Sequence, residues 1–73
     1  MYKWKIDVSL KSGENIVGLY ESKHNNSTDV GSELLEKIAP NCMFTLASLD
    51  GKSQIFIITG EVAAMLISVA KSY

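Results

Sequence analysis

The sequence predicts an α+β fold: a small bent antiparallel sheet, or partial barrel, of about five strands with one helix, in the order β-β-α-β-β-β. Three observations predict it. Apolar and polar residues alternate strictly over residues 2–10, which is typical of a half-buried strand. Residues 28–38 place apolar side chains at helical spacing. An Asp-Gly pair stands between two later apolar runs and indicates a β-hairpin.

The first two strands are expected to form a hairpin. The turn occupies residues 11–14, where Gly13 can adopt a positive φ. The second strand runs over residues 15–22, and Gly18 in its middle predicts a bulge or a sharp bend. Lysines on the polar face of the first strand are interpreted as protection of a sheet edge; they are Lys3, Lys5 and Lys11.

A polar loop over residues 22–27 precedes the helix, and either Thr28 or Asp29 is a suitable N-cap. The helix is predicted over residues 28–38, because Pro40 ends it. Its apolar face, which should pack on the sheet, consists of Val30, Leu34, Leu35 and Ile38. The carboxylates of Glu33 and Glu36 are assigned to its solvent face.

The remaining segments are predicted to be strands. Residues 42–49 form the third, and the Asp50-Gly51 turn leads to a fourth over residues 54–59. This fourth strand is apolar on both faces, so it is expected to be central or covered on both sides. Residues 62–69 suit either a helix or a strand, and a short turn followed by a strand over residues 64–69 is favoured. Trp4, Ile6 and Phe56 are assigned to the core.

Length and charge exclude several classes of protein. A chain of 73 residues forms one domain, residues 1–73. Its net charge is -1 and its seven basic residues are all Lys, so nucleic-acid binding is not favoured. The longest apolar-rich stretch is far shorter than the ~20 residues that span a bilayer, so a cytoplasmic protein without membrane contact is expected.

Few side chains in the sequence are of the types that catalyse reactions or bind metals. Cys42 and His24 are the only candidate pair for nucleophilic catalysis or metal binding, and Cys42 at the start of an apolar strand is expected in the core. We therefore predict no enzyme activity, no cofactor and no metal.

Two segments resemble the Sm-like family. Leu10-Lys11-Ser12-Gly13, followed by Gly18, has the spacing of that family's first hairpin, and residues 57–62 loosely resemble its second motif. The resemblance implies a small five-stranded barrel that closes into a ring and binds RNA. The family's conserved Asp and Asn would fall near His24 and Thr28, and its Arg at Thr59, so no RNA-binding residue is carried over.

The short length and the lack of a catalytic motif also look like those of small accessory proteins encoded by phages. We predict a non-catalytic binding module that acts as a homo-oligomer. It would bind a host protein or sequester a small polar ligand such as a nucleotide signal; the alternative is an Sm-like RNA-binding ring. The contacts are expected in and beside the long polar loop, at Tyr20, Lys23, His24, Asn25 and Asn26. Tyr73 is also expected to touch a partner.

Overall fold

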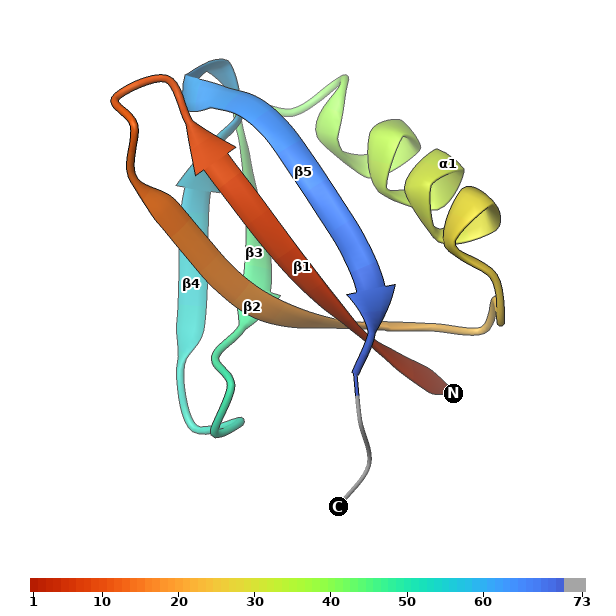
Figure 1. Ribbon diagram of the computed structural model, residues 1–73. Coiled ribbons are helices and arrows are strands. Elements are labelled where there is room, and N and C mark those ends of the chain that lie inside the picture. The colour runs from red at the N-terminus through yellow and green to blue at the C-terminus, as the bar shows by residue number, and fades with distance from the viewer. Residues whose placement is uncertain (71–73) are drawn as a thin grey trace.

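One helix and five antiparallel strands make up the protein, in a computed structural model that describes residues 1–70 (Figure 1). The strands join in a single open sheet of order β4-β3-β2-β1-β5. The elements are β1 (Tyr2–Leu10), β2 (Asn15–Ser22), α1 (Ser27–Ile38), β3 (Met43–Ala47), β4 (Gln54–Ile58), the 3-10 turn η1 (Thr59–Glu61) and β5 (Val62–Val69). The α+β class and the order β-β-α-β-β-β are confirmed, and the ambiguous last segment is a strand.

The strand β1 lies inside the sheet. It pairs with β2 in an unbroken register and with β5 on its other side. Gly13 in the turn between β1 and β2 has a φ of 95°, as expected. The edge-protection hypothesis for Lys3, Lys5 and Lys11 is wrong, because β5, from the far end of the described chain, occupies that side of β1.

Gly18 is a point of close approach, and the predicted bulge is absent from the β1–β2 pairing. Gly18 stands opposite Ile6 in regular register. A Cβ at this position would lie 2.7 Å from the Cβ of Leu46 and 3.0 Å from the carbonyl oxygen of Ala47. Only a glycine therefore lets β3 cross this closely over the curved β2 strand (Figure 1).

The core lies between the inner face of the sheet and α1, which contacts both β5 and β3. Its buried apolar residues are Trp4, Ile6, Val8, Val30, Leu34, Ile38, Phe44, Leu46 and Ile57. Trp4 and Ile6 are thus confirmed as core residues. No helix within residues 1–70 has the length and apolar character that a membrane crossing requires.

Two details of the helix differ from expectation. Its N-cap is Asn26, whose side-chain oxygen accepts from the backbone N–H of Asp29 at 2.9 Å, so neither Thr28 nor Asp29 caps it. Leu35 is 61% exposed and does not face the sheet. The helix buries a narrow stripe at every fourth residue, and Leu35 is rotated about 100° from that stripe.

The strand β4 is an edge strand, which corrects the expectation that it is central or covered on both faces. Ile57 is buried at 2% exposure, whereas Phe56 is 63% exposed and so is not a core residue. The strand is at an edge because it pairs with β3 alone. Its successive side chains point to opposite faces of the sheet, and only the face that carries Ile57 meets the core. The turn before it behaves as predicted: Gly51 has a φ of 73°, and Asp50 accepts hydrogen bonds within the turn.

Candidate functional site

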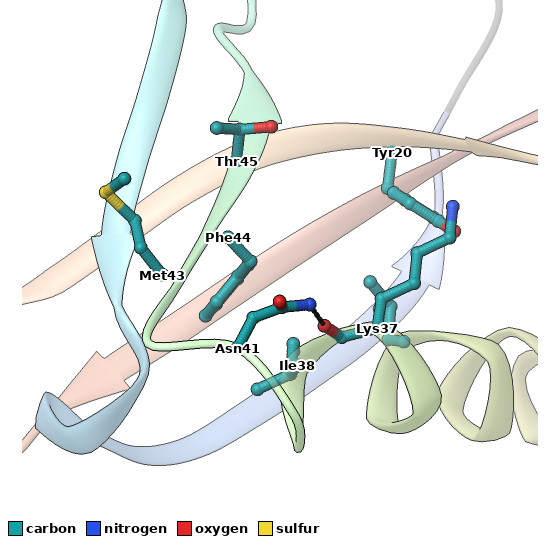
Figure 2. A pocket seen from close by; sticks show the side chains of 8 residues that line it. Tyr20, Lys37, Ile38, Asn41, Met43, Phe44 and Thr45 are labelled. Carbon is teal, nitrogen blue, oxygen red and sulfur yellow. Dashed lines mark hydrogen bonds between the residues drawn. The ribbon is translucent and has the colours of Figure 1, made fainter.

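The candidate site is a pocket where β2 and β3 separate. The two strands pair only at Leu19 and Ala47. Beyond this pair the second half of β2 and the first half of β3 diverge, and α1 lies over the gap. A pocket of about 310 Å³ results, and Figure 2 shows it. Its lining comes from β2, α1, β3 and the loop between the last two: Tyr20, Leu34, Lys37, Ile38, Asn41, Met43, Phe44 and Thr45.

Backbone groups of β3 also face this gap. The N–H of Thr59 donates to the carbonyl of Cys42. The backbone carbonyl of Cys42 therefore points toward the end of β4. Orientation alternates along an antiparallel strand, so Met43 and Thr45 turn their N–H and C=O toward β2. Since β2 pairs with β3 only at Ala47, these groups meet no strand at the gap. The pocket therefore offers main-chain donors and acceptors.

Tyr20 and Lys37 carry the polar chemistry of the pocket. The hydroxyl oxygen of Tyr20 is buried, and no hydrogen bond within the described residues satisfies it. The ammonium of Lys37 lies 5.1 Å from the centre of the Tyr20 ring and beside its hydroxyl end (Figure 2). The polar contact with Tyr20 and, more weakly, the charge of Glu33 raise the pKa of Lys37. Lys37 is therefore a cation at neutral pH.

The rest of the lining holds this pair in place. Asn41 donates from its side-chain nitrogen to the carbonyl of Lys37 at 2.6 Å, which caps the end of α1 and leaves its side-chain oxygen as an acceptor (Figure 2). Leu34, Ile38 and Phe44 are buried and form an apolar floor. A cation, a phenol and an apolar surface thus meet in one small pocket.

The loop after β2 is fixed to both the sheet and the helix. The hydroxyl of Ser22, which is buried, donates to Glu33 at 2.7 Å and accepts from the N–H of His24 at 3.1 Å. The indole of Trp4 donates to the carbonyl of His24 at 3.2 Å. The hydrogen bond from Ser22, and then the nearby Tyr20 hydroxyl, lower the pKa of Glu33. Glu33 is half-buried and its carboxylate anchors the loop through Ser22, contrary to its assignment to the solvent face.

The five predicted contact residues do not form one site. Tyr20 lines the pocket. Asn26 is the N-cap of α1, and His24 acts through its backbone. Lys23 is exposed, and Asn25 lines a separate, wider groove of about 1170 Å³ beside the start of β1. Tyr73 lies outside the described residues.

Lys37 and Asn41 were missed by the sequence reasoning, although a signal for them exists. Counted from Leu34, the residues Lys37, Ile38 and Asn41 come three, four and seven positions later, which is the spacing of a single helix face continued past the end of α1. The buried leucine at the start of this series indicates that its polar members lie at the margin of the core.

Cys42 is exposed, which corrects its assignment to the core. It lies in the loop before β3, where the chain has left the helix and its side chain does not enter the sheet. Among the described residues Cys42 and His24 share no hydrogen bond, and no three His, Cys, Asp or Glu side chains of residues 1–70 are grouped to hold a metal ion.

None of the protein-family models, curated proteins or solved structures compared with this chain matches it. The Sm-like resemblance and the phage-type interpretation stay predictions.

Proposed function

We propose that this protein is a non-catalytic binding module whose pocket between α1, β2 and β3 holds a small planar acid. The observation that carries the proposal is the buried hydroxyl of Tyr20, which makes no hydrogen bond of good geometry within the described residues although the ammonium of Lys37 and the carboxylate of Glu33 lie near it. A buried hydroxyl without a partner costs about 1–3 kcal/mol, which a ligand acceptor would recover.

An anionic group suits this pair. A carboxylate or phosphate can accept from Lys37 and from Tyr20 together, and hydrogen bonds to a charged acceptor are stronger than neutral ones. Glu33 accepts from Ser22 and does not line the pocket, although its negative charge acts on both Lys37 and Tyr20. In the pocket lining an anion would meet one cation, Lys37, and one neutral donor, Tyr20.

The volume and the floor of the pocket define the rest of the ligand. About 310 Å³ is at the lower end of the ~300–1,000 Å³ typical of ligand pockets. Leu34, Ile38 and Phe44 make the floor apolar, so the part of the ligand that rests on it is proposed to be a flat ring. A single aromatic ring with a carboxylate or phosphate fits these limits, and a mononucleotide would fit with its sugar or base at the open side.

The protonation state of the pocket supports binding over catalysis. Its titratable side chains are Tyr20 and Lys37. A catalytic lysine needs a lowered pKa so that the free amine can attack or take a proton. The pKa of Lys37 is raised, so the side chain serves as a fixed positive charge.

The test is calorimetric titration with phenyl phosphate, benzoate, adenosine monophosphate and inorganic phosphate. We expect the ring-bearing anions to bind and inorganic phosphate alone to bind more weakly. Lys37→Gln should weaken binding by roughly tenfold or more, the loss of a charge-assisted contact. Lys23→Gln removes the same charge outside the pocket and should leave affinity unchanged. Equal affinity in both variants, or no heat with any probe, would refute the proposal.

Tyr20→Phe separates a ligand contact from a structural role. The substitution removes only the unpartnered hydroxyl, so the ligand-free protein should keep or gain stability while affinity for phenyl phosphate falls. If instead the ligand-free protein lost stability and affinity stayed the same, the hydroxyl would be structural.

A further inference from the structure

The free edge of β4 is uncharged and apolar. Neither β3 (Met43–Ala47) nor β4 (Gln54–Ile58) contains an ionisable side chain. Three large apolar side chains on the outer face of this hairpin are half or more exposed: Met43 at 50%, Phe56 at 63% and Ile58 at 62%. Met43 and Ile58 are cross-strand partners, so the exposed groups are neighbours.

The backbone of β4 is also available for pairing. Because Thr59 donates to Cys42, alternate residues of β4 turn their N–H and C=O toward β3, and the residues between them face the open edge. The outward residues are Gln54, Phe56 and Ile58. Proteins commonly protect such an edge with lysine, proline or a bulge. The strand β4 has no Lys or Pro, and its register with β3 is unbroken.

We propose that β4 pairs in antiparallel fashion with β4 of a second copy of this chain, around a twofold axis at Phe56. Phe56 then faces its own copy, and Gln54 faces Ile58 of the other chain. In this register the pairs of outward-facing residues, Phe56 with Phe56 and Gln54 with Ile58, exchange both N–H···O=C bonds, and the pair of Ile55 with Ile57 between them exchanges none. Exposed side chains stay on the outer face, with two aromatic rings side by side at the axis.

The lack of charge on β4 fits a second copy of this chain as the occupant. A twofold axis through an antiparallel strand pair places each strand against an identical one, so charges on the strand would face like charges. The strand β4 has none, so it is complementary to itself. Pairing would join the two five-stranded sheets into one continuous sheet.

This inference is independent of the proposed function. The pocket opens on the side of β3 that faces β2, whereas the proposed interface is the far edge of β4. A variant that loses the dimer should still bind phenyl phosphate if the pocket assignment is correct.

The test is sedimentation velocity and native mass spectrometry of the full chain over a wide concentration range. We expect the mass of two chains, each of 8.0 kDa. Phe56→Lys, which places two like charges at the axis, should give the mass of one chain. The matched control is Leu66→Lys, since Leu66 is equally exposed at 66% but lies on β5. This control should keep the dimer.

A mixing experiment excludes simple misfolding. Phe56→Glu alone should also be monomeric, but an equal mixture of Phe56→Glu and Phe56→Lys should form the mixed dimer. The proposal is overturned if wild-type protein is a monomer at the highest concentration, if Phe56→Lys remains a dimer, if the mixture stays monomeric, or if the assembly is a ring of more than two chains.

Discussion

The two edges of the sheet differ in what lies beside them. The edge strand β5 has α1 packed along it (Figure 1), and a Cβ at Gly31 would be 3.5 Å from the Cδ1 of Ile67. The edge strand β4 has only β3 beside it among the described residues. A single helix of 12 residues can flank one edge of a five-stranded sheet, so the other edge depends on its own composition or on a partner.

The helix α1 also accounts for the position of the pocket. Because α1 also reaches β3, it bridges the gap where β2 and β3 separate, and the pocket forms beneath it. The candidate pocket therefore lies inside the sheet, between β2, β3 and α1, and the proposed interface lies at its β4 edge.

The largest effect should come from weakening the helix. Leu34→Ala removes a side chain that is 2% exposed and should lower the free energy of unfolding by about 2–5 kcal/mol. Leu35→Ala, one residue along, removes one that is 61% exposed and should change stability by less than about 0.5 kcal/mol. Urea denaturation of both variants measures the difference. Equal losses would show that α1 packs through a different face.

The adjacent residues Ile57 and Ile58 test the edge strand β4 in the same way. Ile57→Ala should cost about 2–3 kcal/mol, the lower part of the usual range, because an edge strand can relax around the space. Ile58→Ala should change the stability of dilute monomer little, since its side chain is 62% exposed. The measurement is urea denaturation at low and high protein concentration. Only Ile58→Ala should reduce the difference in unfolding free energy between low and high protein concentration.

Gly18→Ala should disturb the close approach of β3 to β2. The new Cβ would overlap Leu46, and no side-chain rotation moves a Cβ, so we expect a loss of about 1–3 kcal/mol. Gly60→Ala is the matched control, because a Cβ there meets nothing within 4 Å. Thermal unfolding followed by circular dichroism compares them. A neutral Gly18→Ala would mean that β3 can move away from β2 without cost.

The smallest effect concerns the loop anchored beside the helix. The pKa of Glu33 is lowered in the folded state, chiefly by Ser22, so its ionised form stabilises the protein above the ordinary value of 4.5. This contribution is lost as the pH falls through the lower, folded pKa. It should be less than about 1 kcal/mol, because the carboxylate is partly exposed to solvent. Urea denaturation between neutral and acidic pH should show a shallower acid loss for Glu33→Gln than for wild type. Ser22→Ala should flatten the profile similarly.

Local sequence patterns were sufficient for most of the fold. Alternation identified β1, positive-φ glycines marked both hairpin turns, and Pro40 marked the end of the helix. The errors at Phe56 and Cys42 concern what covers a segment and where a strand begins, which the local sequence does not show. An apolar strand such as β4 has the same local sequence whether it is central or at an edge.

The site was less accessible to prediction for a related reason. Tyr20 was identified as a contact residue, but its partner Lys37 is brought near only because β2 and β3 separate after one pair. The separation follows the close approach of Leu46 to Gly18, and these residues are far apart in the chain, so no local pattern reveals it. Loop composition drew attention to residues 23–26, whose side chains and backbone mostly hold the loop in place.

The position of β1 has a consequence for biosynthesis. A ribosome makes β1 first among the strands, yet β1 completes its hydrogen bonding only with β5, the last of them. Until β5 emerges, one side of β1 remains unpaired and the apolar inner face is incomplete. The nascent chain can form the β1–β2 hairpin early, but closing the sheet is a late step that follows the synthesis of every other element.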